Sequence, residues 1–267
     1  MSLNVATALV STRLSPELLA PAGSPSMLRT ALAYGADAIY AGQPRYSLRV
    51  RNNEFGRIEA LAGAIDDAHA AGRKLYVVSN VLPHNSKVRS YLADMAPVVA
   101  LKPDALIMAD PGLIDLVREN WPEMPVHLSV QANTVNFAAA HFWRKIGISR
   151  IILSRELSLD EVAEIRQECP EMELEVFVHG ALCIAYSGRC LLSGYFNHRD
   201  PNQGTCTNSC RWDYKLKAAG AADADRPGAC SSTSAGGSAI GDWLLEEKER
   251  PGELMPIDED EHGTYIM

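Results

Sequence analysis

Short runs of apolar residues alternate along most of the chain with stretches of helical periodicity. The runs predict seven β-strands, at residues 17–22, 37–42, 74–81, 104–109, 126–132, 150–154 and 174–179. Helices are expected between them, near residues 25–34, 58–71, 87–100, 111–120, 136–146 and 159–169. Regular alternation of this kind, with short connections, is typical of an α/β protein with a parallel sheet covered by helices.

The number of units favours a TIM-like (β/α) barrel over an open doubly wound sheet. No GxGxxG follows the first strand and no GxxxxGK[ST] is present, so the two usual nucleotide-binding motifs of open sheets are missing. Closing such a barrel takes about eight strands, and the sequence offers seven. We therefore expect an incomplete barrel, with its gap between strands 17–22 and 174–179.

Polar residues stand where the predicted strands end. In barrels of this kind the carboxyl ends of the strands form the active-site face. A single polar residue there is equally well explained by the polarity of loops, but the agreement of all seven ends favours a common site. The candidates around a reacting group are Asn80, Asp110, Gln131, Asn133, Glu156 and His179. Of these, the candidate catalytic residues are Asn80, Gln131, Glu156 and His179.

The organisation of the chain changes after Gly180. We expect an N-terminal extension at 1–16, barrel units at 17–180, a Cys-rich segment at 181–216, a flexible Ala/Gly/Ser-rich loop at 217–239 and an acidic, irregular segment at 240–267. A short strand is predicted at residues 264–266. The chain is expected to be truncated, because the last barrel strand has no convincing place in it.

Composition and charge narrow the class of protein. With 267 residues, of which 47% are hydrophobic, the chain suits one large or two small globular domains. No apolar run reaches the ~18 residues of a membrane-spanning helix, and no secretory signal is evident, so a cytoplasmic protein is expected. The net charge is −8, and residues 217–267 contribute −7 of it. Because the remainder is nearly neutral, nucleic-acid binding is not excluded.

Four of the six cysteines fall together as Cys183-x6-Cys190-x15-Cys206-x3-Cys210. Disulfides are disfavoured without a secretory context. A structural zinc site usually shows two close cysteine pairs, and here only the second pair is close. An iron–sulfur cluster tolerates irregular spacing, so cluster, zinc and unligated cysteines all stay open.

Two segments combine arginines with aromatic residues, as RNA binding requires. Residues 44–57 carry a net charge of +3, and residues 180–216 carry +2. Both follow predicted strands, so both should lie on one face of the barrel. Solvated loops with stacked arginines would explain the same pattern. The candidate substrate-binding residues are Arg45, Arg49, Arg51, Arg155 and Arg189.

Several long motifs resemble one family. They are ELLAPAG at 17–23, GADAIYAG at 35–42, GQPRYSLRVRNNEF at 42–55, EVFVHGALCIAYSGRCLLS at 175–193 and RDPNQGTCTNSCRW at 199–212. These motifs resemble the collagenase-like peptidases of unknown catalytic type, family thirty-two. The third and the fifth are most similar to a branch of that family that hydroxylates tRNA.

The resemblance implies a TIM-like barrel and a [4Fe–4S] cluster held by Cys183, Cys190, Cys206 and Cys210. It also implies hydroxylation of the wobble uridine of tRNA to 5-hydroxyuridine, with prephenate as a co-substrate. The partners would then be tRNA and prephenate, with no membrane. Prephenate is a dicarboxylate suited to bidentate guanidinium contacts, so the arginines could serve either ligand.

Two other functions remain as alternatives. The family's name suggests a peptidase, yet the chain has neither GxSxG nor HExxH. A Cys183 nucleophile with His179 as its base is conceivable. The third reading is a non-catalytic RNA-binding protein that uses a cluster for structure.

Overall fold

A computed structural model describes residues 15–43, 45–49, 53–180, 183, 185–187, 189–218, 243–260 and 263–266. The chain divides into two compact units, one ending at Thr207 and one beginning at Asn208. We call them the barrel unit and the C-terminal unit, and each is described by itself. The division falls inside the expected Cys-rich segment 181–216.

Seven parallel strands form the sheet of the barrel unit, in the order β1-β2-β3-β4-β5-β6-β7. They are β1 (Leu19–Pro21), β2 (Ala38–Gly42), β3 (Lys74–Ser79), β4 (Ala105–Met108), β5 (Val126–Leu128), β6 (Arg150–Ile152) and β7 (Glu173–Glu175). Each coincides with a predicted strand, and each pairs in parallel with the next along the chain. The prediction of a TIM-like, incomplete barrel is confirmed.

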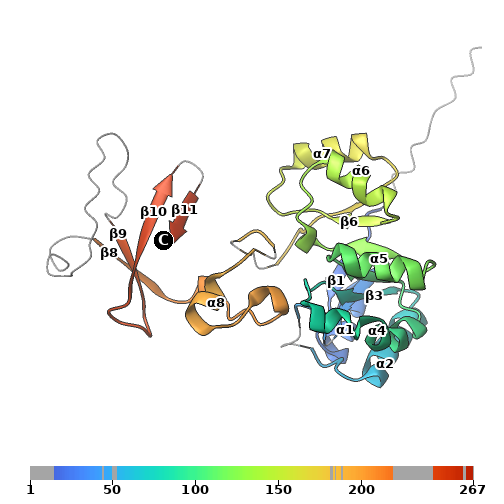
Figure 1. Cartoon of the computed structure of the whole chain (residues 1–267). Helices are drawn as coiled ribbons and strands as arrows, with labels where there is room; N and C mark the ends of the chain where they lie inside the picture. The colour runs from blue at the N-terminus through green and yellow to red at the C-terminus, as the bar shows by residue number, and fades with distance from the viewer. Residues whose placement is uncertain are drawn as a thin grey trace, which may run out of the picture. The chain divides into compact units, whose positions relative to one another are not determined.

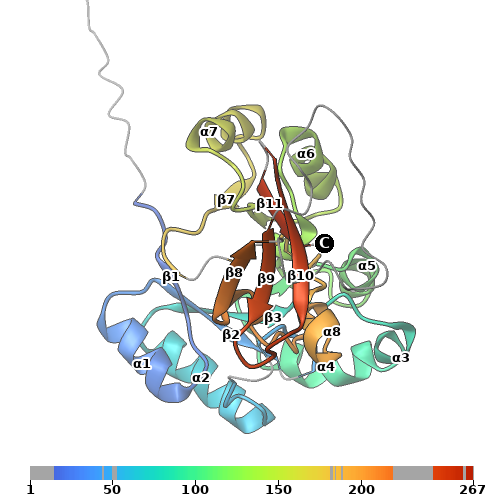
Figure 2. The same ribbon diagram turned by 90° about the vertical axis from the view of Figure 1, so that its left-hand side faces the viewer.

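Helices connect the strands and surround the sheet (Figure 1; Figure 2). Their bounds are α1 (Pro25–Ala33), α2 (Ile58–Ala70), α3 (Asn85–Val88), α4 (Tyr91–Ala100), α5 (Pro111–Asn120), α6 (Phe137–Lys145) and α7 (Leu159–Glu168). A further helix, α8 (Leu192–Asn197), follows the last strand of this sheet. Side chains cap most of the connecting helices. Ser24, Asp110, Asn136 and Ser158 each accept a hydrogen bond from the backbone of the first turn.

Alternate residues of the strands face two different cores. The larger core lies between the sheet and the helices and takes residues such as Ile39, Val77 and Leu106. The smaller core lines the inner face with Ala38, Tyr76, Val78, Ala105, Ile107, Val130 and Ile152. The inner set is small because side chains from several strands meet inside the curled sheet.

Charged residues join distant strands at the amino ends of the sheet. Arg150, at the start of β6, donates to Glu17 across 2.6 Å and to Glu173 across 2.8 Å. Glu17, just before β1, also accepts from Lys74 at 2.9 Å and from the Tyr76 hydroxyl at 2.8 Å, both on β3. We call these five residues the floor network. They bring β1, β3, β6 and β7 together, which requires the sheet to curl.

The gap in the barrel lies where the sequence predicted it. β1 pairs only with β2, and β7 pairs only with β6, among the described residues. Predicted strand 174–179 is consequently shorter than expected, and β7 ends at Glu175. The pairing of β7 with β6 stops where Ile152 meets Glu175, and no other described strand pairs with β7 beyond that point.

The C-terminal unit corrects one expectation. The acidic segment 240–267 was expected to be irregular, with a short strand near its end. Instead, β8 (Tyr214–Ala218), β9 (Trp243–Glu247), β10 (Leu254–Asp260) and β11 (Gly263–Ile266) form an antiparallel sheet in the order β11-β10-β9-β8. Cross-strand pairing of opposite charges supports it, as between Lys217 and Glu246 at 2.8 Å.

No helix in the described part of the chain combines the length and the hydrophobicity that crossing a membrane requires.

The floor network predicts a specific loss of stability. Burial alone would raise the pKa of Glu17, but hydrogen bonds from Arg150, Lys74 and Tyr76 lower it to about 2. A lowered carboxyl pKa stabilises the fold above about pH 4.5, and that contribution is lost as the pH falls through about 2. We expect Glu17→Gln to lower the free energy of unfolding at pH 7 by about 3 kcal/mol and to flatten its dependence on pH between these values.

Urea denaturation from pH 3 to pH 7 measures both effects. The matched control is Asp67→Asn, which removes an exposed pair with Arg29 at 3.7 Å and should cost less than about 1 kcal/mol. Equal losses in the two variants would show that the floor network does not hold the barrel.

Candidate functional site

The loops at the carboxyl ends of β2 and β3 are built around two amide side chains. Gln43 Oε1 accepts hydrogen bonds from the backbone N–H groups of Arg45 and Tyr46, both at 2.7 Å. Asn80 Oδ1 accepts from the backbone of Leu48 at 3.1 Å, and its Nδ2 donates to Ser129 Oγ at 3.1 Å. Asn80, predicted as a catalytic residue, therefore lies at the expected face and joins loops that follow three strands.

The cysteine-bearing segment is fastened to the same face. Asn133 Nδ2 donates to the backbone oxygen of Ser187 at 2.6 Å, and Arg155 Nη2 donates to Ser187 Oγ at 2.8 Å. Asn133 ends the short turn after β5, where it has a left-handed φ of 52°, and Arg155 follows β6. We call these two contacts the Ser187 latch. It holds the chain between Cys183 and Cys190 against the ends of two strands.

A second contact holds the later part of that segment. Gln203 donates through Nε2 to the backbone oxygen of Leu82, and its Oε1 accepts from Lys87 Nζ at 3.1 Å. Leu82 follows β3 and Lys87 lies in α3, so Gln203 binds the loop between them. The Cys-rich segment thus contacts the barrel unit at the ends of β3, β5 and β6.

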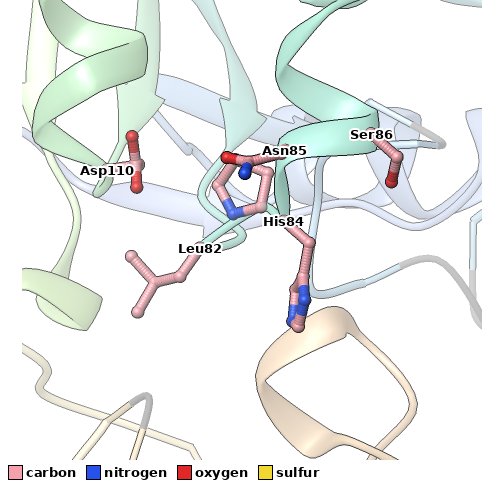
Figure 3. Close-up of a pocket in the computed structure, with 6 residues that line it drawn as sticks. Leu82, His84, Asn85, Ser86 and Asp110 are labelled. Atoms are coloured by element: carbon pink, nitrogen blue, oxygen red, sulfur yellow. The ribbon is translucent and has the colours of Figure 1, made fainter.

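An open pocket of about 600 Å³ lies beside the Gln203 contact (Figure 3). Residues after β3 and one residue after β4 line it: Leu82, Pro83, His84, Asn85, Ser86 and Asp110. Asp110 uses Oδ1 to cap α5 by accepting from Leu113 N at 2.9 Å. Pockets of this size at the strand ends of a barrel commonly hold a small ligand or part of a larger one.

Several buried polar atoms near β5 and β6 have no hydrogen-bond partner within the described chain. Gln131 Oε1, Asn133 Oδ1, Thr134 Oγ1, Ser154 Oγ and Arg155 Nε all belong to the stretches that follow these two strands. Buried polar groups are nearly always satisfied, so their concentration at one edge marks a place where water or a ligand is expected. Gln131, a predicted catalytic residue, belongs to this group.

Glu175 is a buried carboxyl that sequence reasoning did not select. Its register partner on β6 is Ile152, which lines the inner core, so Glu175 faces inward too. Its nearest cation is Arg150, 3.7 Å away, and its Oε2 accepts no hydrogen bond from the described residues. Burial raises the pKa of Glu175 to about 7, against the opposing effect of Arg150. A charged residue within the otherwise apolar run of residues 174–178 was the available signal.

The predicted substrate-binding arginines have different surroundings. Arg45 pairs with Asp94 of α4 at 2.7 Å. Arg49 donates to the Tyr40 hydroxyl at 2.6 Å and lies over that ring, while Arg155 lies over the ring of Phe177. Arg189 is exposed, and Arg51 falls outside the described residues. Arg49 and Arg155 both follow strands, so they stand on the face where an anionic substrate would arrive.

The two remaining predicted catalytic residues are exposed. Glu156 follows β6, and His179 lies four residues beyond the end of β7. The structure joins neither side chain to another described residue by a hydrogen bond. In particular, no hydrogen bond links His179 to Cys183 among the described residues.

The described cysteines differ in their exposure to solvent. Cys169 is buried behind α7, where its thiol contacts the backbone oxygen of Phe137 at 3.6 Å. Cys183, Cys190, Cys206 and Cys210 are more accessible, and none of the described cysteines forms a disulfide. Thiols of this kind suit a cluster. Among the described residues, no group of three or more Cys, His, Asp or Glu side chains is placed around a common point.

Comparison with known proteins gives the relationships of the chain. A model of peptidase family U32 matches residues 23–267. tRNA hydroxylation protein P of Escherichia coli strain K12 is 59% identical over 262 residues, which cover 94% of this chain and 58% of that protein. The 23S rRNA 5-hydroxycytidine C2501 synthase of the same strain is 34% identical over 201 residues, which cover 75% of this chain and 30% of that enzyme.

The solved structure of the U32 peptidase Mk0906 has the same fold. It superposes with a TM-score of 0.51 at 18% identity, over 61% of this chain and 68% of that one. The present chain spans about three fifths of the length of the first of these relatives.

The environment of Glu175 predicts a stability that depends on pH. Since its pKa is raised above the ordinary 4.5 to about 7, the fold binds its proton more tightly than the unfolded chain does. The free energy of unfolding should therefore fall as the pH rises from about 4.5 to 7, by at most about 3 kcal/mol from this group. Glu175→Gln should remove that fall and raise the melting temperature at pH 8. Exposed Glu164→Gln is the control, and an unchanged slope in Glu175→Gln would contradict the assignment.

The Ser187 latch predicts a change in thiol reactivity. We expect Arg155→Ala combined with Asn133→Gly to speed alkylation of half-buried Cys190 by about tenfold, because two hydrogen bonds to Ser187 are lost. Glycine is chosen at 133 because it keeps the left-handed backbone without strain. Exposed Cys183 is an internal control whose rate should change little.

Peptide mass spectrometry after iodoacetamide pulses measures both rates. Arg144→Ala, which removes an exposed arginine on α6, serves as the matched variant. Equal acceleration in that variant would show that Ser187 is not what restrains the segment.

Proposed function

The chain belongs to peptidase family U32, and from that membership we propose that it hydroxylates RNA, with tRNA as its substrate. The observation that carries the proposal is the 59% identity, over 94% of this chain, to a protein named for tRNA hydroxylation. The family model matches residues 23–267, which include the site described above.

A further relative supports the type of chemistry. The 23S rRNA 5-hydroxycytidine C2501 synthase is named for a hydroxylated pyrimidine in RNA. Two related proteins are thus named for hydroxylation of RNA. The product we propose here is 5-hydroxyuridine at the wobble position, a base already accessible in the anticodon loop.

Prephenate is part of the proposal as the co-substrate. A dicarboxylate needs cations that are not already neutralised by a carboxylate. Arg49 and Arg155 meet this need better than Arg45, because they contact a phenol and an aromatic ring, whereas Arg45 pairs with Asp94. The buried unpartnered atoms of Gln131 and Asn133 lie on the same face and would supply neutral hydrogen bonds.

The cofactor in the proposal is a [4Fe–4S] cluster on Cys183, Cys190, Cys206 and Cys210. When bound, such a cluster supplies electrons or a site for an oxygen donor. The contribution of the chain itself is to hold the segment that carries these cysteines. The Ser187 latch does so at the ends of β5 and β6, and Gln203 does so after β3.

A chimeric protein tests the proposal, because the relative supplies the parts of its length that this chain does not cover. The matching region of the Escherichia coli protein is replaced by this chain, and the chimera is expressed in a strain that lacks the protein. We expect mass spectrometry of tRNA nucleosides to show restored 5-hydroxyuridine derivatives. Cys190→Ser should reduce them at least 100-fold, while Cys169→Ala, a change at a buried structural thiol, should retain most of the product.

Other outcomes separate the alternatives. Iron counted on the anaerobically purified chimera should fall with Cys190→Ser and not with Cys169→Ala. Cleavage of gelatin with tRNA unchanged would favour the peptidase. Tight tRNA binding with neither activity would favour a non-catalytic RNA-binding protein.

A further inference from the structure

The open pocket beside Gln203 lies at the carboxyl ends of β3 and β4 (Figure 3). Its volume of about 600 Å³ accommodates a nucleotide but not a folded domain. It is open to solvent, so a base that is turned out of a loop can enter it. None of its lining residues belongs to the set that sequence reasoning selected as catalytic.

The lining combines an apolar surface with polar atoms that make no hydrogen bond within the described chain. Leu82 and Pro83 supply apolar area. Asn85 and Ser86 are exposed and make no side-chain hydrogen bond within the described chain. Asp110 caps α5 by accepting a hydrogen bond at Oδ1, so its Oδ2 can accept one from a ligand.

Charge excludes one class of ligand. Neither lysine nor arginine lines the pocket. Of the cations nearby, Arg45 is neutralised by Asp94, and the Lys87 ammonium bonds Gln203 outside the lining. A dicarboxylate would therefore meet the carboxylate of Asp110 without a compensating cation, which is unfavourable. A neutral, planar ligand with its own donors and acceptors fits better.

We propose that this pocket receives the uracil base of the RNA substrate. The inference rests on the proposed function and names the subsite for its target base. The imide edge of uracil offers one donor between two acceptors. A carboxylate oxygen of Asp110 would accept from N3–H, and the Asn85 amide would donate to a carbonyl oxygen, while Leu82 and Pro83 contact the ring.

The position of Gln203 links the pocket to the cysteines. Its amide bonds both the backbone of Leu82 and the ammonium of Lys87, and it lies three residues before Cys206. His84 points toward the segment that carries α8 (Figure 3). The segment that carries the candidate cluster ligands thus fixes one wall of the base pocket.

Photocrosslinking tests the placement. An anticodon stem–loop with 4-thiouridine at the wobble position is bound to the 267-residue chain, irradiated, and the crosslinked peptides are mapped. We expect crosslinks to residues 82–86, and we expect Asn85→Ala to reduce them at least tenfold. Asn120→Ala, an exposed asparagine at the far end of α5, is the matched control and should leave them unchanged.

A second variant guards against a loss caused by misfolding. Asn85→Asp keeps the size of the side chain but removes its donor, so it should weaken binding of a uridine stem–loop relative to a cytidine one. Crosslinks confined to the surroundings of Arg49 or Arg155 would overturn the pocket while leaving RNA as the substrate. Absence of stem–loop binding would overturn the pocket together with the proposed function.

Discussion

The ion pair between Glu17 and Arg150 is the interaction on which the barrel unit depends. A closed barrel is held by backbone hydrogen bonds around its whole circumference, whereas this sheet has an interruption between β1 and β7. Arg150 spans that interruption, because it bonds Glu17 before β1 and Glu173 in β7. Side-chain electrostatics at the amino ends of the strands thus replace part of the missing ladder and set the curvature of the sheet.

Because the curvature is set at the amino ends of the strands, the loops at the carboxyl ends can form the candidate site. The floor network holds the amino ends together, so the carboxyl ends are left for loops that are not needed for closure. Asn80, Asn133 and Arg155 come from different strands, yet each reaches a loop or segment from another part of the chain. The division of labour is the usual one for barrels, with stability at one end and the candidate site at the other.

The fold was largely readable from the sequence because its signals are local. Each strand is an apolar run and each helix has its own period, so the elements appear at the predicted positions. The predicted strand 126–132 gave way to a turn at Val130–Ala132, and helix 87–100 divided at Ser90 into α3 and α4. Most of the sheet of the C-terminal unit was missed, because β9 and β10 end in acidic residues and Pro256 lies within β10, and both features disfavour a strand in the sequence. The sheet is supported by pairs such as Lys217 with Glu246.

The candidate site was only partly readable, because its contacts are not local. The rule that strand ends carry function selected Asn80, Gln131 and Arg155, which do lie at that face. It could not reveal that Ser187 is the partner of Arg155, or that Glu175 faces Arg150 inside the sheet. These pairs join residues that are 32 and 25 positions apart, respectively, and they follow from the curling of the sheet rather than from any motif.

The interruption between β1 and β7 also bears on how copies of the protein meet. An edge strand without a partner is a template for the edge strand of another molecule, and Val176 and Phe177 beside β7 are exposed. Glu17 flanks one edge, and Glu173 and Glu175 belong to the other. Joining the β1 edge of one copy to the β7 edge of the next would bring carboxylates of both together. Glu17 and Glu173, which Arg150 joins within one copy, thus place acidic side chains on both edges and disfavour growth into a continuous sheet.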